Sequence, residues 1–126
     1  MQNRKIVWIG RVLSLLVTLP FLLSSIMKFL KPPMVTEGMA QMGLPASLLL
    51  PLAILEMSCV ILYLIPSTAV LGAILLTGYI GGAMLTHLRM GQGVLLHIFL
   101  GVAVWGGLYF RDLRIRELIP LRKNPI

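Results

Sequence analysis

Long apolar stretches separated by short polar segments dominate the pattern along this chain. Four stretches cover residues 6–30, 46–65, 68–88 and 94–110. Each is close to the roughly 17–25 residues that a helix needs to cross the hydrocarbon core of a bilayer. None shows the alternation of apolar and polar positions that the strands of a membrane barrel require. The pattern therefore predicts an all-α membrane protein with a four-transmembrane-helix antiparallel bundle.

The composition agrees with a chain that lies mostly in lipid. Of its 126 residues 58% are hydrophobic and 12% are charged, and the mean hydropathy is +0.95. Soluble domains carry about 25% charged residues, so this chain lacks the polar surface to face water. A signal peptide is the alternative for the first stretch, but its apolar run exceeds the usual 7–15 residues or so and no A-x-A-like site follows. We expect residues 1–126 to form a single transmembrane domain.

Basic residues gather at both ends of the chain, and the net charge is +7. The first group is Arg4, Lys5 and Arg11, and the second is Arg111, Arg114, Arg116, Arg122 and Lys123. The positive-inside rule then predicts that both termini are cytoplasmic. We expect the protein to lie in the cell inner (plasma) membrane. The basic tail has no interleaved aromatic residues, so we expect it to contact anionic lipid rather than nucleic acid.

Glycines predict close helix contacts in the last two stretches. Gly78 and Gly82 form a small-xxx-small face in the third, and Gly101, Gly106 and Gly107 repeat this feature in the fourth. The longest loop, residues 34–43, follows a Lys-Pro-Pro segment that ends the first helix, and it has room for a short interfacial helix.

Polar residues fall into two layers when depth is counted at about 1.5 Å per residue. The deep layer holds Glu56, with Thr77, Tyr79 and Trp105 as candidate hydrogen-bond partners. The outer layer is basic and holds Lys28, His87, Arg89 and His97. A direct salt bridge from Lys28 to Glu56 is not expected, since it would span roughly 12 Å of height. The candidate ligand-binding residues are Lys28, Glu56, Thr77, His87, His97 and Trp105.

Two interpretations of Glu56 stay open. In the first, a neutral carboxyl group forms hydrogen bonds between helices and makes the packing specific, because a low-dielectric site disfavours the charged form. In the second, Glu56 handles a proton or orients a ligand, as ionisable groups inside membranes commonly do. In both, we expect a neutral acid rather than an ion pair with Lys28.

The sequence offers little for metal binding or catalysis. Cys59 is the single cysteine, so no disulfide or thiolate cluster can form within the chain. His87 and His97 lack a third strong ligand, and we expect them to be interfacial polar residues. Methionines would suit copper(I), but no tight cluster exists beyond Met39-x-x-Met42. We therefore expect no metal site, no catalytic residues and no independent enzymatic activity.

Four short motifs follow one another along the chain: residues 24–29 (SSIMKF) match S-G-x-x-K in part, Glu56 lies within an L-E-x-x-G/A-like pattern, residues 82–91 (GAMLTHLRMG) match G-A-x-x-x-H-L-R-x-G, and residues 105–122 match W-x-G-L-x-x-R-D…P-L-R. Together these motifs resemble those of the DoxX-like family of small bacterial membrane proteins. The resemblance covers nearly the whole chain. This sequence departs from the pattern at Ser25, where glycine is common, and at Gln92, where an acid often follows.

The resemblance implies two hypotheses of function. Relatives include the small subunit of a thiosulfate:quinone oxidoreductase, partners in oxidative-stress complexes and membrane chaperones. The chain would then be a subunit or auxiliary of a quinone-linked membrane redox system, with a quinone or similar molecule in a pocket that opens to the extracytoplasmic side. The alternative is a non-catalytic scaffold or assembly factor. A redox role needs a membrane or redox protein partner or the quinone itself. A homo-oligomer stays open, and a third hypothesis, proton-coupled transport, would require one.

Overall fold

A computed structural model of the chain describes residues 4–122, and this part contains helices and no strands. The elements are α1 (Arg4–Leu30), α2 (Pro33–Gln41), η1 (Ala46–Leu48), α3 (Leu49–Leu64), η2 (Pro66–Thr68), α4 (Ala69–Arg89), α5 (Leu95–Arg111) and α6 (Leu113–Leu118). The four predicted long helices are all present, and their ends lie within two residues of the predicted bounds except at the start of the second, where the 3-10 turn η1 precedes α3 and α3 begins three residues later than predicted. The short helix predicted in the longest loop is α2, and residue Lys123 of the basic tail lies outside the described residues.

Three spans are long and apolar enough to cross a membrane: Arg4–Leu30, Ala46–Leu64 and Pro66–Arg89. α5 is also apolar but has 17 residues. At about 1.5 Å per residue it is roughly 26 Å long, which is near the lower limit for a crossing. The architecture is that of a helical membrane protein. The side of the membrane that each end faces stays a prediction.

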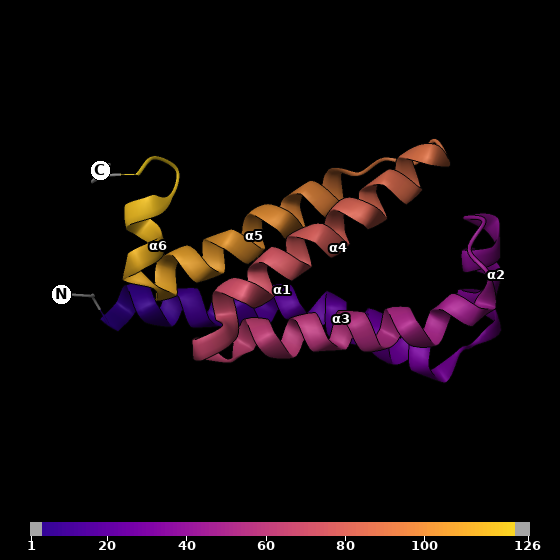
Figure 1. The fold of residues 1–126 in the computed structure, drawn as a ribbon, viewed down its shortest axis with the longest axis horizontal. Helices are drawn as coiled ribbons and strands as arrows, with labels where there is room; N and C mark the ends of the chain where they lie inside the picture. The colour runs from indigo at the N-terminus through magenta and orange to yellow at the C-terminus, as the bar shows by residue number, and fades with distance from the viewer. Residues whose placement is uncertain (1–3, 123–126) are drawn as a thin grey trace.

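The long helices form a ring in which α1 contacts α3 and α5, and α4 contacts the same two helices. Figure 1 shows that α1 runs beside α3 and α4 runs beside α5, and that these two pairs diverge along the molecule. We call the end that holds the start of α1 and α6 the terminal end. The opposite end, which holds α2 and the turn between α4 and α5, is the loop end. The pairs are closest at the terminal end and farthest apart at the loop end (Figure 1).

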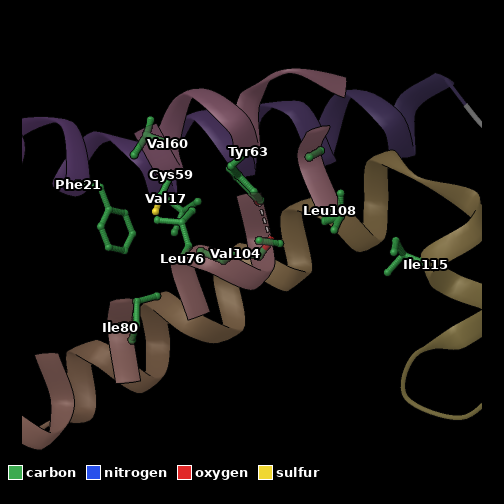
Figure 2. Close-up of a cluster of buried hydrophobic side chains, with 12 residues drawn as sticks. Val17, Phe21, Cys59, Val60, Tyr63, Leu76, Ile80, Val104, Leu108 and Ile115 are labelled. Carbon is green, nitrogen blue, oxygen red and sulfur yellow. Dashed lines mark hydrogen bonds between the residues drawn. The ribbon is translucent and has the colours of Figure 1, made fainter. Parts of the chain in front are cut away.

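Buried side chains hold the two pairs together. The residues in Figure 2 include Val17, Phe21, Cys59, Val60, Tyr63, Leu76, Ile80, Val104, Leu108 and Ile115. Tyr63 is fully buried, and its hydroxyl donates a hydrogen bond to the Val104 carbonyl at 2.6 Å. The Ser14 hydroxyl lies 3.3 Å from the Tyr63 hydroxyl oxygen and donates a hydrogen bond to the Gly10 carbonyl. The polar atoms of this core are therefore satisfied across α1, α3 and α5, as burial requires.

We call the halves of the bundle nearer to the terminal end and the loop end the terminal half and the loop half. Close helix contacts in the terminal half depend on glycines. A Cβ atom on Gly72 would lie 2.2 Å from the backbone nitrogen of Tyr63, and one on Gly107 would lie 2.6 Å from Ser14 Oγ. A Cβ on Gly10 would lie 2.6 Å from the nitrogen of Arg111. Only glycine fits where backbones approach this closely, so the prediction for Gly107 is confirmed.

Gly78 and Gly82 do not lie against another helix of this chain, so the predicted close helix contacts were wrong for packing within the described residues. A Cβ atom on either glycine, or on Gly101, would meet nothing within 4 Å, and one on Gly106 would make an ordinary contact. The reason is that both glycines lie on the exposed face of α4, whereas Leu76 and Ile80 on the other face pack into the core. The glycine pattern marks where a helix can be approached, but it does not say which helix approaches it.

Candidate functional site

The structure divides the six candidate residues between the two helix pairs. Lys28 and Glu56 lie on α1 and α3, while Thr77, His87, His97 and Trp105 lie on α4 and α5. The sequence suggested a single polar pocket, but the structure places its residues in two separate groups, one on each helix pair.

Lys28 and Glu56 form a direct salt bridge. Lys28 Nζ lies 3.2 Å from Glu56 Oε2, and the two side chains are 13% and 1% exposed. Ser24, one turn before Lys28 on α1, accepts a hydrogen bond from Lys28 Nζ and lies 3.4 Å from the same carboxylate oxygen. The expectation that Lys28 and Glu56 form no direct pair was wrong.

The reason is the direction in which helical side chains lean. Ser25 Oγ donates to the Ala53 carbonyl at 2.9 Å, which sets the level of α1 against α3. Lys28 is about one turn from this level toward the loop end, and Glu56 about one turn toward the terminal end. Side chains lean toward the N-terminus of their helix, and these helices are antiparallel. The two side chains therefore lean toward each other, which a count of backbone height alone cannot show.

Glu56 also has an unused acceptor. Its second oxygen, Oε1, is buried and has no hydrogen-bond partner among the described residues. Tyr79 on α4 lies near enough to the carboxylate for an electrostatic interaction. The carboxylate thus faces α4 as well as α1.

Thr77 and Trp105 form a second polar contact, between α4 and α5. The indole Nε1 of Trp105 donates to Thr77 Oγ1 at 2.8 Å, and the Thr77 hydroxyl donates to the Ala73 carbonyl at 2.7 Å. Both groups are therefore occupied by each other and by the backbone. They line one end of a groove with a volume of about 510 Å³.

The groove between α4 and α5 is almost entirely apolar. Its walls are formed by Thr77, Ile80, Gly81, Met84, His97, Ile98, Gly101, Val102 and Trp105. Gly81 and Gly101 leave the space open, because a side chain at either position would point into a region with no atoms within 4 Å. The shape of the groove thus follows from small residues on both helices.

His97 lines the groove and carries an unpartnered polar atom. Its Nδ1 is buried and has no hydrogen-bond partner within the described chain. The ring lies against that of His87, with centroids 4.5 Å apart and planes at 53°. His87 Nδ1 lies 2.7 Å from the Ala83 carbonyl, which can only accept, so this nitrogen carries the hydrogen. His87 is therefore fixed by its own helix, and His97 is left to bind something else.

The remaining basic residue of the outer layer serves the fold. Arg89 Nη2 donates to the carbonyl of Met42, in the loop after α2, and so ties the end of α4 to the loop between α1 and α3. Over residues 4–122 no group of three or more His, Cys, Asp or Glu side chains could hold a metal ion. The arrangement offers an apolar groove with one free imidazole nitrogen, and a separate buried ion pair.

Ser24 is the residue of the ion pair that sequence reasoning missed. It lies four residues before Lys28, and residues four apart share one face of a helix. A hydroxyl one helical turn before the lysine could therefore have predicted the hydrogen bond between Ser24 and Lys28.

Comparison with known protein families identifies a relationship for most of the chain. The sequence model of the DoxX-like family matches residues 12–107, which include every candidate site residue. No curated protein and no solved structure matches the chain.

Proposed function

The chain belongs to the DoxX-like family, and from this premise we propose that it binds a quinone-like molecule in the groove between α4 and α5. It does so as a subunit or auxiliary of a quinone-linked redox system in the inner membrane. With both termini cytoplasmic, the His97 end of the groove is the extracytoplasmic end. The chain contributes the binding site, and a partner protein or the quinone itself carries the electrons.

The buried and unpartnered Nδ1 of His97 is the observation that supports this proposal. A buried polar atom without a partner costs about 1–3 kcal/mol, and a quinone carbonyl oxygen is an acceptor that an imidazole N–H can satisfy. The groove volume of about 510 Å³ lies within the range of roughly 300–1,000 Å³ typical of small-molecule sites. The indole ring of Trp105 gives a flat wall for a flat ligand.

The ion pair has a different role in this proposal. Lys28 and Glu56 join α1 to α3 and do not contact the quinone. They keep the first helix pair together at the level where the second pair moves away. Substituting them should change stability more than quinone affinity.

Tryptophan fluorescence gives a direct test, because the chain has two tryptophans. In the Trp8→Phe protein, Trp105 in the groove is the one remaining reporter, and a short-chain quinone added to lipid nanodiscs should quench it saturably. In the Trp105→Phe protein, Trp8 lies at the terminal end, and quenching should rise linearly with quinone in the bilayer. His97→Phe keeps a ring against His87 but removes the nitrogen, so it should weaken saturable quenching about tenfold.

Two outcomes would contradict the proposal. One is equal, unsaturable quenching of both tryptophans, which is what quinone dissolved in the bilayer produces. The other is saturable quenching that His97→Phe leaves unchanged.

A second candidate function, a scaffold for other membrane proteins, is favoured by the unused glycine face of α4. Gly78 and Gly82 lie one turn apart, and a Cβ on either would meet no atom of this chain. Such faces let a second helix approach closely in membranes. Gly78→Leu and Gly82→Leu should then release a partner that co-purifies with the wild-type protein. Val70→Leu, an enlargement at another exposed position of α4, is the matched control.

A further inference from the structure

A second hollow lies at the terminal end, far from the α4–α5 groove. Its volume is about 440 Å³, and its walls come from α1, the turn between α3 and α4, and the end of α5. Apolar side chains such as Val7, Leu15 and Leu108 form much of the wall, while Arg11 and Arg111 bring two guanidinium groups to it. The hollow thus combines an apolar surface along a membrane-spanning helix with positive charge at one end.

Both arginines are held in place without a carboxylate partner. The Arg11 guanidinium lies over the Trp8 ring at 5.3 Å from its centroid. Arg111 donates to the Tyr63 carbonyl and lies 4.6 Å over the Tyr63 ring, and its Nε is buried with no hydrogen-bond partner. Neither arginine forms a salt bridge within residues 4–122.

The one acidic residue of the hollow is already engaged. Asp112 accepts hydrogen bonds from the backbone nitrogen and the guanidinium of Arg114. Its charge also acts on the neighbouring Arg111, but one carboxylate against the two guanidinium groups of Arg11 and Arg111 leaves the lining of the hollow with a net positive charge. A phosphate group is the anion whose oxygens match two such guanidinium groups.

From these observations we propose that the terminal hollow binds one anionic phospholipid. Its phosphate contacts Arg11 and Arg111, and an acyl chain lies along the apolar wall formed by α1. The lipid source is favoured over free phosphate because apolar side chains from Val7 to Leu15 form a wall along α1, to which a soluble anion has nothing to bind. Trp8, beside the arginines, is of the type that favours the headgroup level of membranes.

The Trp105→Phe protein, in which Trp8 is the one tryptophan, reports on this site. Reconstituted in nanodiscs with dibrominated phosphatidylglycerol or phosphatidylcholine, Trp8 should be quenched preferentially by the anionic lipid. Removal of one juxtamembrane arginine changes anionic-lipid binding by about fivefold. Arg11→Gln should therefore lower the ratio of the two lipid affinities by about fivefold. Inorganic phosphate added to phosphatidylcholine nanodiscs should leave the fluorescence unchanged.

Arg4→Gln is the matched control, because Arg4 lies on the same helix near the same end, is exposed and does not line the hollow. It should keep the wild-type ratio. The proposal is overturned if Arg11→Gln keeps that ratio, or if Arg4→Gln lowers it equally, which would show diffuse attraction. A phosphate-dependent change that the lipid does not compete with would assign the site to a soluble anion instead.

Discussion

Glycines in the terminal half of the bundle lie against neighbouring helices, whereas those in the loop half face open space. A Cβ on Gly72 or Gly107 would collide with Tyr63 or Ser14, but one on Gly78, Gly82 or Gly101 would meet nothing within 4 Å. Glycine therefore permits close helix packing in the terminal half and leaves space unfilled in the loop half. Packing specificity lies in the terminal half, and the space for a ligand or partner lies in the loop half.

The polar groups follow a related division. In the terminal half the Tyr63 and Ser14 hydroxyls both donate to backbone carbonyls and lie 3.3 Å from each other. Farther toward the loop end, Glu56 Oε1 and His97 Nδ1 are buried and have no hydrogen-bond partner among residues 4–122. Each such atom costs about 1–3 kcal/mol, which binding of a ligand or partner can recover. The loop half, which holds these unpartnered buried atoms, is therefore the half where we expect binding to occur.

The strongest way to break this division is Gly72→Ala. The new methyl group would lie 2.2 Å from the nitrogen of Tyr63, and its neighbours are backbone atoms that cannot move cheaply. We expect a loss of stability of more than about 3 kcal/mol, beyond the usual cost of overpacking, and little monodisperse protein in detergent. Size-exclusion chromatography and thermal unfolding measure this. A well-folded Gly72→Ala protein would show that the terminal half is not closed.

Lys28→Met tests the ion pair where the halves meet. It leaves the Glu56 carboxylate, whose side chain is 1% exposed, without its cation, which typically costs about 3–5 kcal/mol. The double variant Lys28→Met/Glu56→Gln should recover most of this loss, because no buried charge remains. Unfolding of both proteins in the same detergent forms the comparison. Equal stability of the wild type and Lys28→Met would mean that the pair contributes nothing.

Tyr63→Phe removes the hydroxyl that joins α3 to α5 in the closed half. The hydrogen bond to the Val104 carbonyl at 2.6 Å is lost, and we expect a destabilisation of about 1 kcal/mol. Tyr109→Phe is the control, since the Tyr109 side chain is half-buried and its hydroxyl has no hydrogen bond within residues 4–122. If both changes have the same effect, the Tyr63 hydrogen bond is not a source of specificity.

The sequence predicted the helices well because length and hydropathy determine them locally. The ends of the four apolar stretches, the stop before Pro33 and the short helix α2 all follow from neighbouring residues. The ion pair could not be predicted by counting residues, because it depends on the antiparallel arrangement of α1 and α3 and on the lean of both side chains. A prediction of side-chain direction from topology would have found it.

The candidate site was predicted as a set of residues but not as a geometry. Depth alone placed Glu56, Thr77 and Trp105 at one level. In the structure, Glu56 instead pairs with Lys28. Thr77 accepts a hydrogen bond from Trp105. Which residues share a site depends on which helices are neighbours and on how the pairs diverge. Neither quantity is encoded within a single helix, so composition and spacing could not supply it.

Gly82→Ala has the smallest expected effect and sharpens the comparison most directly. Because a Cβ there would meet nothing within 4 Å, the change adds helix propensity without a clash and should stabilise the protein by up to about 1 kcal/mol. Thermal unfolding of the purified chain beside Gly72→Ala measures the contrast between the halves. A destabilising Gly82→Ala would mean that this face is covered in the membrane by another helix. That result would favour the scaffold function, because the close approach predicted from the glycine pattern would then be made by a second protein.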